Sequence, residues 1–205
     1  MSLPFRRHPR VHAKIRIAQH CAEAGFDEKA VAYWLKAGLQ SVARSAMTEA
    51  SAQLRKGLKL IAAIADSHSQ LQYELDLQMA LGPALLATKG FAASEVGDTF
   101  ARARTLAEQL DRPEYQVPLL YGLRLYHTVR SEFELGLSFA TQITQIGEAR
   151  ADRAVQLLGL RCRGEIDLYM GDFVGARALF EQCHEMRDPK IRAVCATFAG
   201  KSSTP

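Results

Sequence analysis

The chain has few of the features that mark secreted, membrane-spanning or disulfide-bonded proteins. Its 205 residues include four cysteines in apolar, helical-looking contexts without a paired framework: Cys21, Cys162, Cys183 and Cys195. No secretory hydrophobic region follows the basic start, because residues 11–25 ("VHAKIRIAQHCAEAG") are interrupted by charge. The longest apolar stretches, such as "MALGPALLA" at 79–87, are too short to span a bilayer. We therefore expect reduced thiols in a soluble, cytoplasmic protein.

The excess of positive over negative charge is also small, since the formal net charge is only +4. Much of the excess lies at residues 6–10 ("RRHPR") and at Lys14 and Arg16. A basic lead of this kind can touch nucleic acid or lipid, but it is more often a solvated terminus. Basic residues are not concentrated on one helix, as a DNA-recognition helix would require. We expect a flexible lead over residues 1–11 and neither nucleic-acid nor membrane binding.

Patterns that would carry catalysis or bind a metal are incomplete. The pairs His20–Cys21 and Cys183–His184 lie at opposite ends of the chain, and adjacent helical residues point about 100° apart. Residues 200–202 ("GKS") match the end of a phosphate-binding loop, but the earlier glycine is missing and no strand precedes them. The sequence therefore predicts no enzyme activity, no metal site and no cofactor.

What the chain does contain is a repeated helical pattern. A small or short residue is followed, four and seven positions later, by further packing residues on the same helical face. The five series begin at Ala30, Ala50, Val96, Gly136 and Ala176. The last three anchors are 40 residues apart, and no strand-like alternation occurs anywhere. The pattern predicts helical hairpins that bury their faces against their neighbours.

A second set of small residues lies on the helix preceding each of four anchors: Gly38, Gly82, Gly122 and Gly164. Glycine inside a helix costs about 1 kcal/mol relative to alanine, so four matched glycines need a reason. Close approach of the partner helix supplies one. The positions expected to pack the repeats together are Trp34, Gly38, Ala50, Gly82, Phe100, Gly122, Gly136, Gly164, Ala176 and Phe180.

Turn and breaker residues predict about ten helices. Pro113 and Pro189 suit helix starts, whereas Pro83 falls inside a helical stretch and is expected to kink it. The expected helices are 12–24, 28–43, 47–64, 68–88, 93–110, 113–130, 132–148, 152–170, 172–186 and 190–199.

The copy at 157–190 resembles a tetratricopeptide (TPR) repeat. It has Gly164, residues 171–173 ("GDF"), Ala176 and Phe180 in the order of that repeat, with Cys183 where alanine is usual. The resemblance implies an all-α, TPR-like right-handed superhelical solenoid of antiparallel helix hairpins over residues 12–199. A disordered tail is expected at residues 200–205.

Two segments, 24–61 and 77–96, look more narrowly similar to the C-terminal array of one group of bacterial signalling proteins. These multidomain proteins carry a class III adenylate/guanylate cyclase head and an AAA-type ATPase module. Their arrays usually continue through several more repeats, so the resemblance implies a fragment or a shortened gene product. The cyclase and ATPase domains are absent from this sequence, and no catalytic residue is carried over.

In TPR-like solenoids the first helix of each pair lines the concave face, and this gives a candidate partner surface. Projection by repeat position selects Leu119, Leu123, Tyr126, His127, Arg161, Glu165 and Tyr169. Aromatic side chains mixed with arginine and glutamate suit an extended peptide or a helix from a protein partner. The alternative, that Tyr126 and Leu123 only pack between neighbouring hairpins, stays open.

Two functions of different class follow. The first is a non-catalytic protein–protein interaction and regulatory scaffold, with a partner that the sequence does not identify. The second is a small-molecule effector-binding solenoid of the kind that gates a transcriptional regulator. In addition, the stripe Ile191, Val194, Cys195 and Phe198 on the expected last helix predicts weak homodimerisation through the ends of the array.

Overall fold

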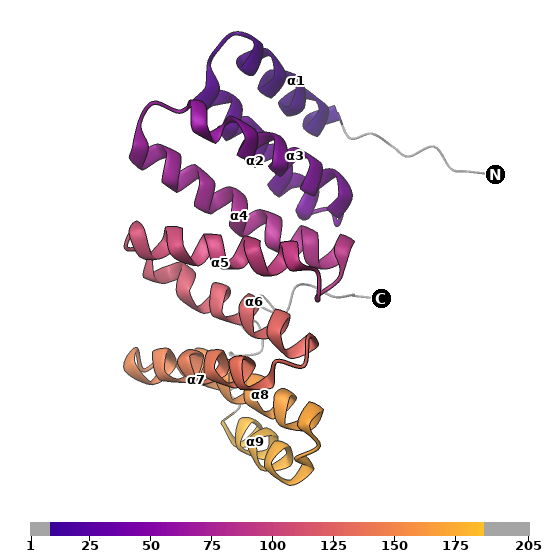
Figure 1. The fold of residues 1–205 in the computed structure, drawn as a ribbon, viewed down its shortest axis with the longest axis vertical. Helices are drawn as coiled ribbons and strands as arrows, with labels where there is room; N and C mark the ends of the chain where they lie inside the picture. The colour runs from indigo at the N-terminus through magenta and orange to yellow at the C-terminus, as the bar shows by residue number, and fades with distance from the viewer. Residues whose placement is uncertain (1–8, 187–205) are drawn as a thin grey trace, which may run out of the picture. The chain divides into compact units, whose positions relative to one another are not determined.

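The computed structural model describes residues 9–186, with side chains from Ala13 onward. Over these residues the chain forms nine α-helices and two short 3-10 turns, with no strand (Figure 1). The elements are α1 (Pro9–Glu23), α2 (Asp27–Val42), α3 (Met47–Leu60), η1 (Ile61–Ala63), α4 (Ser67–Lys89), α5 (Ser94–Gln109), η2 (Pro113–Tyr115), α6 (Gln116–Val129), α7 (Phe133–Ala149), α8 (Arg153–Met170) and α9 (Phe173–Glu185). The expected all-α class is confirmed; the expected helix 190–199 lies outside the described residues.

Helix boundaries differ from the sequence expectation at a few places, each with a local cause. Helix α1 begins at Pro9 rather than at residue 12, because proline is well tolerated at the first helical position. Helix α3 ends at Leu60 and tightens into the 3-10 turn η1, where the expected helix ran to residue 64. Helix α4 continues through Pro83 to Lys89.

Most helix–helix turns share one hydrogen-bonded geometry. After α7, the N–H of Ala151 donates to the carbonyl of Glu148 (3.1 Å), and the N–H of Asp152 donates to that of Gly147 (2.8 Å). This is the Schellman pattern, which needs a left-handed residue just past the helix. The left-handed residues are glycine in some turns and other residues in the rest: Gly25, Ser45, Asp111, Ser131, Ala151 and Gly171. From Asp111 to Gly171, each left-handed residue follows the previous one by 20 positions, so the helix between each two of these turns occupies a segment of the same length.

The chain divides into two compact units, residues 1–113 and 114–205. In the first unit α1 contacts α2, α2 contacts α3, α3 contacts α4 and α4 contacts α5. Helix α2 also contacts α4. Gly38 of α2 lies against the Leu54 side chain of α3, and Gly82 of α4 lies against the Phe100 ring of α5. The first helices of successive hairpins, α2 and α4, are therefore neighbours, as in a repeat array.

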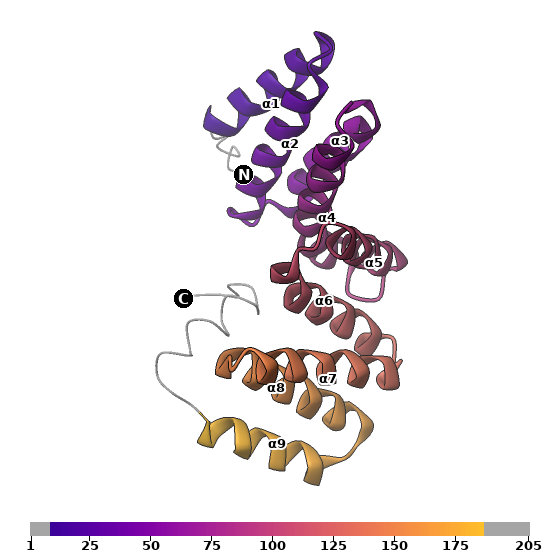
Figure 2. The same ribbon diagram turned by 90° about the vertical axis from the view of Figure 1, so that its left-hand side faces the viewer.

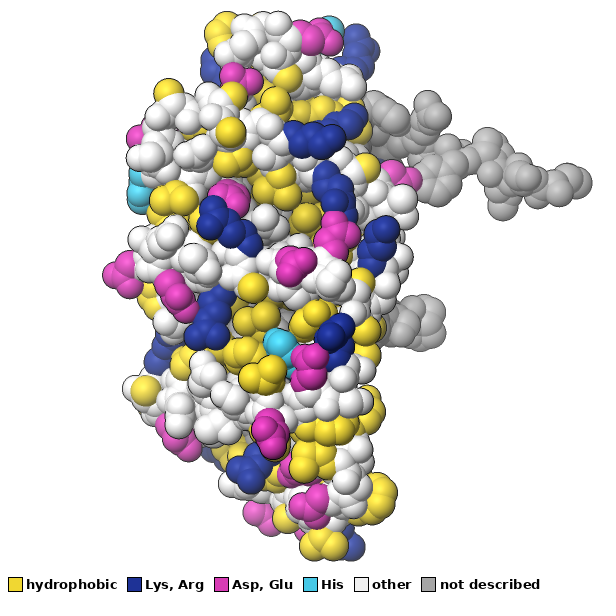
Figure 3. Space-filling view, viewed as in Figure 1, with side chains coloured by type: hydrophobic (Ala, Val, Ile, Leu, Met, Phe, Trp, Pro, Cys, Tyr) yellow, Lys and Arg dark blue, Asp and Glu magenta, His cyan; other side chains and the backbone are white. Residues whose placement is uncertain are grey.

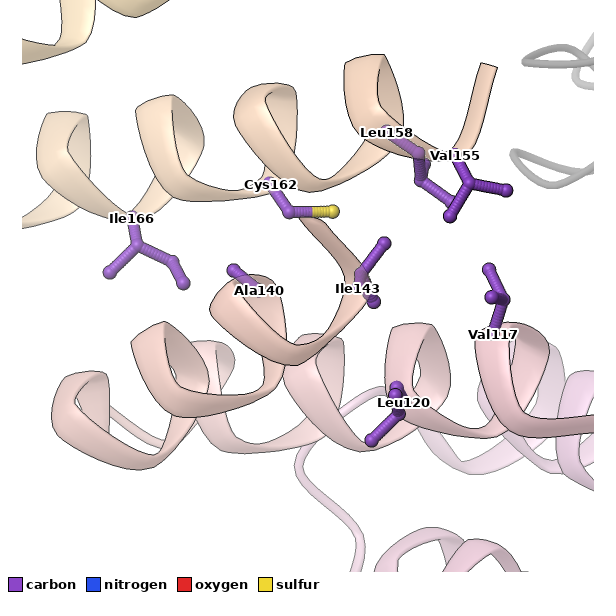
Figure 4. Close-up of a cluster of buried hydrophobic side chains, with 8 residues drawn as sticks. All are labelled: Val117, Leu120, Ala140, Ile143, Val155, Leu158, Cys162 and Ile166. Atoms are coloured by element: carbon purple, nitrogen blue, oxygen red, sulfur yellow. The ribbon is translucent and has the colours of Figure 1, made fainter. Parts of the chain in front are cut away.

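The second unit has the same organisation, with α7 packed on α6, α8 on α7 and α9 on α8. Figure 2 shows α7, α8 and α9 as successive layers. Side chains from α6, α7 and α8 point toward one another in one buried cluster (Figure 4): Val117, Leu120, Ala140, Ile143, Val155, Leu158, Cys162 and Ile166. Helix α6 also contacts α8, so the first helices of these two hairpins lie next to each other.

Glycines set how closely the helices of the second unit approach. A Cβ on Gly164 of α8 would lie 3.1 Å from the Phe180 ring of α9. Two glycines that the repeat pattern did not select come closer to backbone. A Cβ on Gly147 would lie 2.5 Å from the backbone nitrogen of Gln156, and one on Gly159 would lie 2.7 Å from that of Thr144. Helices α7 and α8 are thus in backbone contact at both positions.

Candidate functional site

The candidate partner surface belongs entirely to the second unit, on the neighbouring helices α6 and α8. Two of its seven residues do not reach solvent, because Leu119 and Leu123 are only 1% and 5% exposed. Both fill packing positions instead of presenting side chains to a partner. The other five residues are at least partly exposed: Tyr126, His127, Arg161, Glu165 and Tyr169.

At the end of α6 an aromatic and charged network fixes Tyr126 and His127. The ring of His127 lies 5.0 Å from the ring of Tyr126 and 5.5 Å from that of Phe139, between centroids. Nδ1 of His127 lies 2.6 Å from the Glu132 carboxylate, which also accepts from Nε of Arg130 at 2.9 Å. The hydrogen bond from His127 is the largest cause that lowers the pKa of Glu132, followed by that from Arg130. The network orients these rings at the rim of the surface.

The middle of the α6–α8 surface contains a buried charge that the sequence reading missed. Arg124 of α6 is 1% exposed, and its Nη1 donates to Oε2 of Glu165 on α8 at 2.9 Å. Oε1 of the same carboxylate lies 3.5 Å from Nε of Arg161. The guanidinium of Arg124 also lies over the Tyr121 ring, 4.9 Å from its centroid. One carboxylate therefore serves two guanidinium groups.

The environment of Arg124 includes the thiol of Cys162, which belongs to the buried cluster. Burial raises the pKa of Cys162 to about 11, although the nearby charge of Arg124 acts to lower it. The thiol is therefore neutral at physiological pH and supplies no counter-charge to the arginine.

The sequence around Arg124 does not indicate that this arginine is buried and paired. It stands in an apolar helix, where an isolated arginine normally extends to solvent along its stem. One feature of the sequence does indicate an ion pair here: Glu165 lies 41 residues after Arg124, which is about one repeat. First helices of adjacent hairpins are neighbours, and two opposite charges at that separation can meet across them.

The end of α8 and the start of α9 expose an unusual amount of apolar surface. Tyr169 is 69% exposed, and four neighbours in the sequence are also exposed: Leu168, Met170, Phe173 and Val174. A hollow of about 560 Å³ next to this turn is lined by Leu168, Phe173, Arg177, Phe180, Glu181, His184 and Glu185. Its mixture of apolar and charged lining residues has the composition of a protein-binding surface.

Other kinds of site lack support within the described part of the chain. Among these residues no group of three or more histidine, cysteine, aspartate or glutamate side chains could hold a metal ion. None of the described helices is long and apolar enough to cross a membrane. Basic and acidic side chains are interspersed with hydrophobic ones over the face in Figure 3, without one broad basic area on that face.

Comparison with known proteins supports the fold. No family model matches the chain. An uncharacterised protein of Rhizobium meliloti (strain 1021) is 28% identical over 161 residues, which is 76% of this chain but only 15% of that protein. Among solved structures, a point variant of nearly identical TPR-like repeats, from a Podosopora anserina protein described as a kinesin light chain, aligns with a TM-score of 0.62. The alignment covers 92% of this chain and all of that one at 15% identity.

Sequence identity at this level shows the fold alone. The relation to cyclase–ATPase signalling proteins stays a prediction, because the matches reported above do not show it. The helix order, the contacts between first helices and the solved structure together show that the chain is a TPR-like helical solenoid.

Proposed function

We propose that this chain is a non-catalytic protein-interaction array, and that the α6–α8 face binds a segment of a protein partner. The observation that carries the proposal is the exposure of Tyr169, at 69%, beside other exposed apolar side chains at the end of α8. Tyrosine contributes a large contact area at low conformational cost, and it is enriched where binding energy is concentrated. TPR-like repeats generally bind proteins, which fits this reading.

The hollow beside α8 and α9, which none of the seven candidate residues lines, suits a peptide or helix better than a small effector. A small-molecule site encloses most of its ligand in a pre-formed pocket. The hollow beside α8 and α9 is instead open, and its lining includes the charged residues Arg177, Glu181 and Glu185. An extended partner can cover such a surface while its polar groups remain in water.

We further propose that the array works as one module of a larger bacterial signalling protein or as a shortened version of one. The chain spans 15% of the length of its relative from Rhizobium meliloti, which is consistent with a module of this kind. The two segments similar to cyclase–ATPase proteins, 24–61 and 77–96, provide the narrower assignment. No residue of this chain is assigned a catalytic role.

The test is affinity capture with a matched pair of variants. Tagged wild-type chain, Tyr169→Glu and Phe91→Glu would be crosslinked in cells of the source organism, and captured proteins compared by quantitative mass spectrometry. Phe91 is an exposed aromatic residue of the first unit, so it receives the same chemical change away from the surface. We expect a partner that is retained by Phe91→Glu and lost by Tyr169→Glu, with the loss reproduced on purified proteins.

Capture that Tyr169→Glu leaves unchanged would contradict the assignment of this face. Circular dichroism of both variants must match the wild type, so that unfolding does not imitate lost binding. A saturable small-molecule ligand found in place of a protein would favour the effector-binding alternative.

Weak self-association is a separate proposal about the exposed apolar turn between α8 and α9. Phe173 and Val174 are 68% and 83% exposed, so a second copy could cover them. Sedimentation velocity across a dilution series would detect a concentration-dependent dimer, and Phe173→Glu should shift it toward monomer. A strict monomer at high concentration would exclude it.

A further inference from the structure

Helix α9 has an open outer face in the described part of the chain. Helix α7, the second helix of the preceding hairpin, packs against both α6 and α8. It buries four residues: Gly136, Ala140, Ile143 and Gly147. The main contact of α9 is with α8, and Ala176 is its only buried residue. The hollow beside α8 and α9 follows the open face, because its lining residues from α9 share one helical face: Phe173, Arg177, Phe180, Glu181 and His184. A hollow of this form suits a helix packed along α9.

The sequence that follows α9 repeats the start of α8. Asp152 lies three residues after the last residue of α7, and its side chain caps α8 by accepting from the N–H groups of Ala154 (3.0 Å) and Val155 (3.2 Å). Asp188, outside the described residues, likewise lies three residues after the last residue of α9. Pro189 then falls at the first helical position, where a missing N–H costs little. The sequence thus indicates a helix that begins at residue 189.

The apolar stripe of this segment also matches α8. Three residues of α8 belong to the cluster buried against α6 and α7: Val155, Leu158 and Cys162. At the offset set by the two aspartates, 36 positions (188 − 152), the equivalent residues are apolar too: Ile191, Val194 and Phe198. Gly159 of α8 lies against Thr144 of α7. The equivalent residues are Cys195 and, at the 40-residue spacing of the anchors (176 − 136), His184, which lines the hollow. The segment therefore has the pattern by which α8 packs on α7.

Charge favours the same occupant. The lining of the hollow includes Arg177, Glu181 and Glu185, so acidic groups outnumber basic ones. Nε of Arg177 donates to Oε1 of Glu181 at 2.7 Å, and Glu185 has no ion-pair partner among the described residues. Residues 189–199 contain two basic side chains, Lys190 and Arg192, and no acidic one. A helix with its stripe against the hollow would place positive charge beside the carboxylates, and such complementarity favours this occupant over an acidic one.

We propose that residues 189–198 occupy the hollow beside α8 and α9 as a helix in the free chain, and that this helix competes with the protein partner for the hollow. Such a helix spans about 15 Å, which fits along the 13 residues of α9. The inference rests on the proposed protein-binding function and specifies its regulation. Leu168 lines the hollow and precedes Tyr169 in the sequence, so a partner that covers Tyr169 meets the helix. The partner then binds in proportion to the fraction of chains in which the hollow is open.

Hydrogen exchange of the full chain, followed by mass spectrometry, tests occupation of the hollow without knowledge of the partner. We expect slow exchange over residues 190–198 in the wild type, and exchange roughly tenfold faster or more there and in α9 for Val194→Glu. Ala193→Glu is the matched control, because on a helix Ala193 lies nearly opposite the stripe, and its exchange should equal that of the wild type. On the side of the hollow, Leu168→Glu should also release residues 190–198. Leu39→Glu, at a similarly exposed leucine of the first unit, should not.

A synthetic peptide of residues 187–199 distinguishes occupation by the same chain from occupation by a second copy. The peptide should bind the Val194→Glu chain saturably and restore slow exchange of α9. It should bind the wild type at least roughly tenfold more weakly, because the hollow is already filled. Fast exchange of residues 190–198 in the wild type would overturn the proposal. Slow exchange that disappears on dilution would also overturn it, since a second copy would then fill the hollow.

The capture experiment connects the helix to the partner. Val194→Glu should capture several times more partner than Ala193→Glu, and equal capture by the two variants would show that the helix does not compete. Failure of this proposal differs from failure of the proposed function. If Tyr169→Glu abolishes capture while residues 190–198 exchange fast, the interaction function stands and the competing helix is wrong. If the exchange and peptide results hold but Tyr169→Glu leaves capture unchanged, the helix fills the hollow and the partner surface is wrong.

Discussion

The backbone contact between α7 and α8 predicts that adding one methyl group at Gly159 destabilises the second unit. A Cβ there would lie 2.7 Å from the Thr144 nitrogen and 2.9 Å from its Cα. Ordinary contacts begin near 3.4 Å, so the helices would have to separate by about 0.7 Å (3.4 − 2.7). Overpacking of this kind costs about 1–3 kcal/mol, whereas alanine gains about 1 kcal/mol in helix propensity. Gly159→Ala should therefore lower the free energy of unfolding by up to about 2 kcal/mol.

Gly164→Ala is the matched control, because it lies in the same helix and gains the same propensity. Its Cβ would meet the edge of the Phe180 ring at 3.1 Å, and a partly exposed ring can move where backbone cannot. Urea denaturation followed by circular dichroism should show Gly159→Ala less stable than Gly164→Ala by about 1–3 kcal/mol. Trp34, the single tryptophan, lies in the first unit, and its fluorescence reports that unit separately. Equal midpoints for the two variants would refute the close-approach argument.

Three further outcomes are expected. Ala151→Gly should stabilise the chain by up to about 1 kcal/mol, because alanine is strained at a φ of 51° and glycine is not; an unchanged or lower melting temperature would count against the left-handed turn. Ala176→Leu should destabilise it by about 1–3 kcal/mol, since Ala176 is fully buried where α8 and α9 touch, and a wild-type melting temperature would show that the repeat register is wrong. Burial raises the pKa of the Cys162 thiol to about 11, so this thiol stays protonated at pH 8. Peptide mapping after iodoacetamide treatment at pH 8 should therefore find Cys162 unmodified and Cys21 alkylated.

Much of the fold follows from features that are local in the sequence. Turn residues, helix periodicity and the 40-residue spacing placed every described helix within a few residues of its observed bounds. The sequence pattern selects Gly38, Gly82 and Gly164 because each lies on the helix before an anchor residue, 12 or 14 positions upstream of it. Gly147 and Gly159 were not, because their close approach depends on how α7 and α8 cross, and no single helix encodes that crossing.

The candidate surface was less accessible to sequence reasoning, because a repeat position does not fix exposure. Leu119 and Leu123 occupy positions that line the open face of a regular TPR-like array, but here they are buried. Arg161, Glu165 and Tyr169 lie in the copy whose spacing is closest to the TPR pattern, and all three retain some exposure. Tyr126 and His127, on the same helix as Leu119 and Leu123, are partly exposed, so projection from a repeat selects a helix but does not fix which of its side chains reach solvent.

The charge of Arg124 is not required for packing at this position of the repeat, because the equivalent position of the next repeat is apolar. Aligning Gly122 with Gly164 places Arg124 opposite Ile166, a fully buried apolar residue of the same packing layer. Replacing a buried ion pair with apolar residues of similar size is often neutral or stabilising by about 1–4 kcal/mol, whereas removing one partner alone is costly. Arg124→Met combined with Glu165→Gln should therefore fold with unchanged or higher stability in urea, whereas Glu165→Gln alone should be destabilised.

Urea denaturation of the wild type, the double variant and Glu165→Gln, followed by circular dichroism, measures these differences. A double variant at least as stable as the wild type would mean that the charge of Arg124 is not kept for packing. A double variant that unfolds would instead show that the ion pair between Arg124 and Glu165 holds α6 and α8 together.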